Sequence, residues 1–128
     1  MEIESNFNLV AVYGTLLKGQ DNHRLIANSK LLGNAIIHGF NMFNIGSFPG
    51  IKEGDNHIEI EVYEVDNDTF KRLDILEGYP YLYDRKLIHT MYGDAWIYVY
   101  NGNINSREEI SSGSWRQFIN EKYANIRN

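Results

Sequence analysis

The sequence predicts an α+β protein whose sheet is strongly curved and largely antiparallel. Residues 57–65 alternate between apolar and polar side chains, which is typical of a strand with one face in water. Residues 83–100 contain two strand-like stretches joined through Tyr92-Gly93-Asp94, a hairpin sequence. Residues 70–77 show helical spacing of apolar side chains.

Composition limits the function classes. A length of 128 residues favours a single domain over 1–128, and the sequence is 43% hydrophobic and 23% charged, as in globular proteins. The net charge of −5 argues against a nucleic-acid partner bound through phosphate neutralisation. The absence of cysteine excludes a thiol nucleophile, a thiolate metal site and a disulfide.

The sequence also gives information about the cellular location and about the role of the aromatic residues. The first residues lack the basic and then apolar pattern of a signal peptide, and no apolar run is long enough to span a bilayer. We therefore expect a cytoplasmic protein with no membrane partner. Nine tyrosines and two tryptophans indicate a β-rich fold, an aromatic-lined pocket, or both.

The first element is a strand over residues 9–13, whose apolar and aromatic run suits burial on both faces. Gly14 follows directly, and the absence of a Cβ there allows a sharp turn. Nearby amide N–H groups could then point at a bound anion. An ordinary strand exit, in which the glycine only permits the bend, is the alternative.

The second element is expected to be a helix. Asp21 or Asn22 can cap it, and Gly33 marks its end. Its apolar residues are Leu25, Ile26, Leu31 and Leu32. A strand over 35–43 follows, with a bend or bulge at Gly39.

Loops and helices complete the order. Residues 46–50 are a loop by composition, and the alternating strand over 57–65 comes next. Residues 66–69 offer several N-caps for the helix over 70–77, which Gly78 ends. After the hairpin strands 83–91 and 95–100 and a polar stretch over 101–113, a short helix is predicted over 114–123. Its inward side chains are Trp115, Phe118 and Ile119.

One carboxylate lies on the inward face of the helix over 70–77. Phe70, Leu73 and Glu77 are spaced i, i+3 and i+7, so Glu77 shares the packed face. Burial and the helix C-terminus both favour a raised pKa, which suits a group that accepts and returns a proton. Two alternatives stay open: Glu77 is solvated at the rim, or Asp74 is the inward acid.

The other candidate residues give weaker indications of a functional site. No histidine pair has a metal-ligand spacing, so no metal site is predicted from His23, His38, His57 and His89. The sequence has no Gly-x-Ser-x-Gly elbow. Arg85 is either a structural ion-pair partner or a substrate contact.

Several motifs, taken in order, resemble the gamma-glutamylcyclotransferase-like (AIG2-like) family. The first is Tyr13-Gly14-Thr15-Leu16, which is similar to the family's Y-G-[ST]-L. The others are Gly46-Ser47-Phe48-Pro49-Gly50, Glu61-Val62-Tyr63, Leu73-Asp74-Ile75-Leu76-Glu77-Gly78, Tyr83-Asp84-Arg85, Ala95-Trp96-Ile97-Tyr98-Val99-Tyr100 and Ser112-Gly113-Ser114-Trp115. Their order and spacing cover most of the chain.

The resemblance implies a small mixed, largely antiparallel β-barrel with flanking helices and a pocket at one end. It also implies cleavage of a γ-glutamyl amide by intramolecular attack. The substrate's α-amine attacks its own γ-carbonyl and releases 5-oxoproline and a free amine or amino acid. This reaction requires no metal and no organic cofactor.

The resemblance assigns roles to particular residues. Glu77 matches the family's catalytic glutamate and would act as general acid and base. Backbone amides around Gly14, Thr15 and Leu16 would hold the α-carboxylate of the substrate, and so bend the glutamyl chain for attack. The side chains expected to line the pocket are Tyr13, Tyr83 and Tyr100.

Two other functions stay open at this point. The same fold could be a non-catalytic module that binds a small carboxylate or a partner protein. Alternatively, water could attack in place of the substrate's amine, which would make the protein an amidohydrolase that releases glutamate.

Overall fold

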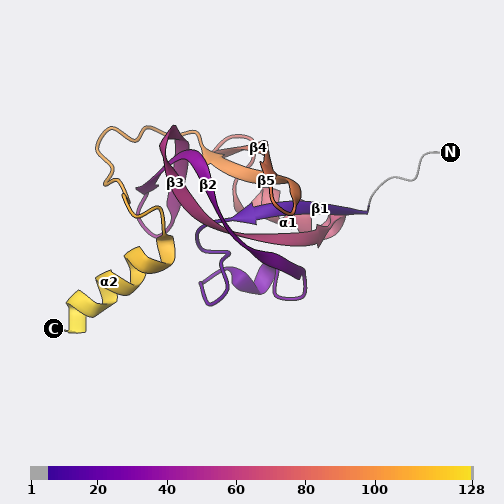
Figure 1. Ribbon diagram of the computed structural model, residues 1–128, viewed down its shortest axis with the longest axis horizontal. Coiled ribbons are helices and arrows are strands. Elements are labelled where there is room, and N and C mark those ends of the chain that lie inside the picture. Colours follow the sequence, from indigo (N-terminus) through magenta and orange to yellow (C-terminus); the bar gives the residue numbers. More distant parts are fainter. Residues whose placement is uncertain (1–5, 128) are drawn as a thin grey trace.

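The computed structural model describes the backbone of residues 6–127 and the side chains of residues 6–124. Its elements are β1 (Phe7–Val12), a 3-10 turn (His23–Leu25), β2 (Lys30–Asn44), β3 (Pro49–Asp66), α1 (Asn67–Leu76), β4 (Tyr83–Thr90), β5 (Gly93–Tyr100) and α2 (Trp115–Arg127). The strands form one sheet in the order β2-β3-β1-β5-β4 (Figure 1). Among these described strands, β1 and β5 are the parallel pair and the other pairings are antiparallel, which confirms a mixed, largely antiparallel sheet.

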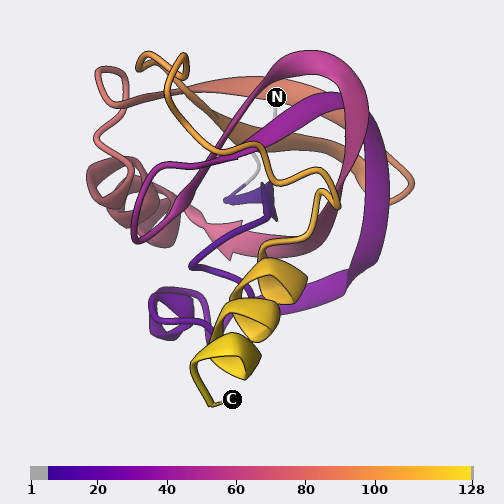
Figure 2. The ribbon, with the colours of Figure 1, turned by 90° about the vertical axis from the view of Figure 1, so that its left-hand side faces the viewer.

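The sheet is curled into a half-barrel. Strands β2 and β3 form a long hairpin that arches around the shorter strands (Figure 2). The pairing register shifts between His38 and Phe40, and Gly39 has a φ of 98°. The bend predicted at Gly39 is therefore confirmed, because a bulge at this position increases the local twist and bends the strand.

Strand β1 lies at the centre of the sheet, between β3 and β5. Val10, Ala11 and Val12 are all buried. A central strand covered on both faces needs no polar alternation, which explains the uninterrupted apolar run. The predicted first strand is confirmed, and its end carries the chain into the turn at Gly14.

Helix α1 is confirmed, but it begins at Asn67, three residues before the predicted range of 70–77, and is capped by one of the predicted N-caps. The Asp66 carboxylate accepts a hydrogen bond from the Thr69 amide at 2.7 Å and so caps the first turn. Leu73 is fully buried on the packed face. Glu77 is the C-cap, and Gly78 ends the helix with a φ of 63°.

The helix predicted after Asp21 or Asn22 is wrong. Only the 3-10 turn His23–Leu25 forms there, and Lys30 already begins β2. Leu31 pairs with Tyr63 of β3, so sheet pairing overrides the local helical spacing. Gly33, expected to end a helix, instead follows a register shift within β2.

The strand predicted over 57–65 also begins earlier than expected, within the glycine-containing stretch that precedes it. Pro49 pairs with Asn44 and Glu53 with Phe40, so β3 begins at Pro49 and the loop is shorter than 46–50. Polar side chains on this outer part of the hairpin hide the strand from pattern analysis.

The C-terminal helix is confirmed and is longer than expected. Trp115 is buried, whereas Phe118 and Ile119 are partly buried against the core. Beyond its first turn α2 extends away from the half-barrel (Figure 1). Within residues 6–127, no helix is both long and apolar enough to cross a membrane.

Gly113 is expected to be essential for stability. It has a φ of 70°, and a Cβ atom there would lie 2.0 Å from the carbonyl oxygen of His57. Gly113→Ala should lower the free energy of unfolding by more than the roughly 1 kcal/mol that a left-handed backbone alone costs. Chemical denaturation measures this loss.

Gly19→Ala is the matched control for this substitution. Gly19 also has a positive φ, 87°, but no atom lies within 4 Å of its Cβ position. Its alanine variant should show the backbone cost alone. Equal losses in the two variants would contradict the proposed clash with His57.

Candidate active site

The turn after β1 passes very close to the beginning of β3. A Cβ atom on Gly14 would lie 2.5 Å from Cγ of Pro49, so only glycine fits without displacement. The φ of Gly14 is not positive, so glycine is needed at this position because space is lacking and not because of the backbone conformation. The Leu17 amide donates to the Gly14 carbonyl at 3.0 Å and closes the turn.

Three successive amides of this turn are unpaired. Within the described part of the chain, the N–H groups of Gly14, Thr15 and Leu16 donate to no hydrogen-bond acceptor. The carbonyls beside them are engaged: Thr15 accepts from the Asn22 amide at 2.8 Å, and Leu16 O lies 2.9 Å from Nδ1 of His23. Consecutive free amides in a turn can bind an anion.

Glu77 lies in the same cavity as this turn. The end of α1 places its partly buried side chain among the lining residues, together with Gly14 and Thr15. Burial raises the pKa of Glu77 from 4.5 to about 7. Among the described residues, its carboxylate has no hydrogen-bond or ion-pair partner. It is therefore available to exchange a proton with a bound molecule.

The neighbouring carboxylate has a different environment. Asp74 forms an ion pair with Arg85, whose Nε lies 3.2 Å from Oδ1, and accepts a hydrogen bond from the Tyr98 hydroxyl at 2.7 Å. The central carbon of the Arg85 guanidinium also lies 4.4 to 4.7 Å from the centroids of three aromatic rings, those of Phe70, Tyr79 and Trp96. Asp74 is thus held by partners, and Arg85 is its structural ion-pair partner.

The tyrosines form walls and supports. The Tyr13 hydroxyl donates to the Tyr98 carbonyl at 2.7 Å, and the Tyr83 hydroxyl donates to the Pro49 carbonyl at 2.7 Å. Burial raises the pKa of Tyr13, and burial raises the pKa of Tyr83 as well, so both phenols stay protonated. Because their protons are held by backbone carbonyls, Glu77 is the group in this cavity that titrates near neutral pH.

Two neighbouring cavities share Glu77 as a lining residue. The inner hollow has a volume of about 30 Å³ and lies against the turn at Gly14. The outer groove has a volume of about 350 Å³ and is lined by apolar and polar side chains of several elements. Both spaces are bordered by Thr15, Phe48, Glu77 and Tyr83.

The structure brings most of the sequence-predicted site residues together. The hollow is lined by Tyr13, Gly14, Thr15, Leu16, Glu77 and Tyr83. Tyr100 is not among the lining residues, and its ring packs edge-on against Tyr83 at 5.4 Å. Tyr98, two residues earlier on the same face of β5, lines the hollow instead. Strand alternation identifies that face but does not choose between the two tyrosines.

These features define a class of protein: a curled α+β half-barrel with a partly buried acid beside a turn of free amides. The family model "Gamma-glutamyl cyclotransferase, AIG2-like" matches residues 10–117. The chain therefore belongs to the AIG2-like gamma-glutamyl cyclotransferase family.

Two sequence relatives agree with this assignment. A Vibrio cholerae protein, provisionally named a gamma-glutamylcyclotransferase, is 41% identical over 113 residues, which cover 88% of this chain and 98% of the relative. The gamma-glutamylcyclotransferase family protein YtfP of Escherichia coli is 38% identical over 106 residues, 83% of this chain and 94% of YtfP.

Solved structures share the fold. The crystal structure of an uncharacterized Pyrococcus horikoshii protein superposes with a TM-score of 0.81 at 29% identity, over 91% of this chain and 97% of that chain. The solution structure of E. coli YtfP gives a TM-score of 0.72 at 37% identity, over 84% and 95% of the two chains.

The raised pKa of Glu77 makes stability depend on pH. The folded state holds the proton up to about pH 7, whereas the unfolded chain releases it near 4.5. The free energy of unfolding of the wild type, relative to Glu77→Gln, should therefore fall by up to about 3 kcal/mol between these pH values. Denaturation of both proteins across pH 4–8 measures this difference. Identical pH profiles would contradict burial of the acid.

Proposed function

We propose that this protein is a γ-glutamyl cyclotransferase with Glu77 as general acid and base. The observation that supports this most strongly is a partly buried carboxylate without partners, beside the unpaired amides of Gly14, Thr15 and Leu16. Family membership supports the general reaction. The single domain and the cytoplasmic location expected from the sequence stay predictions.

In the proposed binding mode, the free amides of the turn hold the α-carboxylate of the substrate. The glutamyl chain then bends so that its α-nitrogen approaches its own γ-carbonyl carbon. Because both reacting atoms belong to one molecule, little further ordering is needed for the attack. Tyr13, Tyr83 and Tyr98 line the hollow beside the turn, next to the proposed position of the chain.

The proposed reaction moves one proton in and out of Glu77. The ionised carboxylate takes a proton from the α-ammonium, and the freed amine attacks the γ-carbonyl carbon. The resulting tetrahedral centre collapses, the original amide C–N bond breaks, and Glu77 returns its proton to the departing nitrogen. The attacking nitrogen passes its second proton to the departing amine, so the products are 5-oxoproline and an alkylammonium ion, and no water is consumed. A pKa of about 7 suits both transfers.

The outer groove is the proposed place of the leaving amine. Its apolar side chains are Phe48, Leu76 and Leu82, and its ionisable residues other than Tyr83 are Asp21 and Glu77. No cationic side chain is among these described lining residues. A leaving group with an alkyl chain therefore fits this groove better than one with a further carboxylate.

Glu77→Gln should abolish most of the turnover. Since glutamine cannot accept the α-ammonium proton, release of 5-oxoproline from a γ-glutamyl alkylamine should fall by about 10²- to 10⁴-fold, with substrate binding largely kept. Mass spectrometry of the products measures this loss. Glu53→Gln, at an exposed carboxylate paired with Lys86, is the control and should keep wild-type turnover.

Product identity separates the competing functions. Glutamate in place of 5-oxoproline would establish attack by water. Absence of any product from a broad panel of γ-glutamyl amides would favour a binding module and contradict the cyclotransferase proposal.

The groove also predicts a substrate preference. A γ-glutamyl n-alkylamine should be turned over with a kcat/KM at least about tenfold above that of γ-glutamylglutamate, because the extra carboxylates of the latter find no cation. Asp21→Asn should narrow the difference in kcat/KM between the two substrates, because it removes a negative charge that repels the carboxylates of γ-glutamylglutamate. Equal kcat/KM values for the two substrates in the wild type would contradict the assignment of the groove.

A further inference from the structure

The segment before α2 is attached to β3 by its backbone. Gly113 lies so close to β3 that a Cβ atom would meet the His57 carbonyl oxygen at 2.0 Å. The Glu59 amide donates to the Gly113 carbonyl at 2.9 Å. This pairing fixes where the last helix begins.

The first turn of α2 is fixed by a cap and a buried ring. The Ser114 hydroxyl accepts a hydrogen bond from the Gln117 amide at 3.1 Å, as an N-cap serine does. Ser114 and Trp115 are both buried. The position and rotation of the first turn are thereby set, and they determine where the next side chain, Arg116, can reach.

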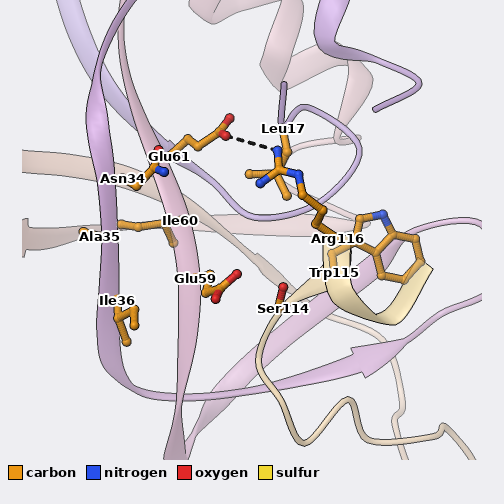
Figure 3. A pocket seen from close by; sticks show the side chains of 10 residues that line it. All are labelled: Leu17, Asn34, Ala35, Ile36, Glu59, Ile60, Glu61, Ser114, Trp115 and Arg116. Carbon is orange, nitrogen blue, oxygen red and sulfur yellow. Dashed lines mark hydrogen bonds and ion pairs between the residues drawn. The ribbon is translucent and has the colours of Figure 1, made fainter. Parts of the chain in front are cut away.

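Arg116 contacts both a buried acid and the turn that follows β1. Its Nη2 donates to Oε2 of Glu61 at 3.2 Å and to the Lys18 carbonyl at 2.8 Å. Figure 3 shows Glu61 and Arg116 reaching toward each other from β3 and α2, beside a cavity of about 350 Å³. Leu17, the residue before Lys18, lines that cavity as well.

Glu61 completes the connection to the turn. Its side chain is 7% exposed, and its Oε1 accepts hydrogen bonds from the Lys18 amide at 2.9 Å and from the Tyr63 hydroxyl at 3.0 Å. Both backbone polar groups of Lys18 are thus held, the N–H by Glu61 and the carbonyl by Arg116. Hydrogen bonds to charged groups are shorter and stronger than neutral ones.

We propose that Glu61 and Arg116 are positioning residues that hold the turn with the free amides in its binding geometry. The proposal rests on the proposed function of that turn, since Lys18 lies two residues after Leu16 in the same loop. Neither side chain is among the residues that line the hollow or the groove at Glu77. Their effect on substrate therefore passes through the backbone of the turn.

The effect expected of these two residues is on binding rather than on proton transfer. Displacing the turn weakens its hold on the substrate α-carboxylate, which is present in both the ground state and the transition state. Loss of such uniform binding raises KM and leaves kcat nearly unchanged. Glu77 is positioned separately, by the end of α1.

Hydrogen exchange of the 128-residue protein tests the connection without any substrate. In Arg116→Ala, the Lys18 amide should exchange at least about tenfold faster than in the wild type, while the amides of β1 keep their protection. Lys122→Ala removes a cation from the same helix without touching the turn and should leave Lys18 unchanged. Unchanged exchange of Lys18 in Arg116→Ala would overturn the proposal.

A double variant tests the proposal even if loss of the Arg116 charge destabilises the fold. Arg116→Ala leaves the buried Glu61 without its cation and could unfold the protein. The double variant Glu61→Gln/Arg116→Ala removes that unpaired charge, and its Lys18 amide should still exchange faster than in Glu61→Gln alone. Equal exchange in these two variants would overturn the proposal.

Kinetics with a γ-glutamyl alkylamine supply the functional readout. The Arg116→Ala variant, or the double variant if the single one does not fold, should raise KM by about tenfold with less than a threefold change in kcat. A lower melting temperature with unchanged KM would reduce the pair to a purely structural role and overturn the proposal. A wild type without turnover would contradict the proposed function, and hydrogen exchange alone would then decide whether the pair holds the turn.

Discussion

The site depends on one steric constraint: residue 14 must be glycine, because a Cβ atom there would collide with Pro49. Gly14 lets the end of β1 approach the beginning of β3, where the Pro49 carbonyl accepts a hydrogen bond from the Tyr83 hydroxyl. The central strand, the long hairpin and β4 therefore meet at one point. Glu77 reaches this point from the end of α1, so the site is assembled from segments that are distant in sequence.

Two carboxylates three residues apart illustrate how environment divides chemical roles. The Asp74 carboxylate contacts the Arg85 guanidinium and the Tyr98 hydroxyl, whereas the Glu77 carboxylate is partly buried and has no partner among the described residues. Desolvation favours the protonated form of Glu77, and it is the only cause needed for the raised pKa. The end of α1 thus presents one carboxylate held by partners and one without partners, and the second is the proposed general acid and base.

Local patterns in the sequence predict those parts of the fold that local interactions determine. The apolar run of β1, the capped helix α1 and the hairpin of β4 and β5 all agree with the structure. The helix expected around Leu31 does not form, because pairing with β3 outweighs local spacing. The placement of Glu77 follows from helical periodicity, whereas the approach of Gly14 to Pro49 and the choice of Tyr98 over Tyr100 depend on tertiary packing.

The last helix has two parts that differ in their tolerance of change. The rotation of its first turn is fixed by the contacts of Trp115 and Arg116, and towards its C-terminal end it extends from the body of the molecule. One residue inserted between Gly113 and Arg116 would rotate the guanidinium by about 100° around the helix axis. Added residues at the far end would leave it in place. A reporter or affinity tag therefore belongs at the C-terminus, whereas the junction before α2 has a fixed length.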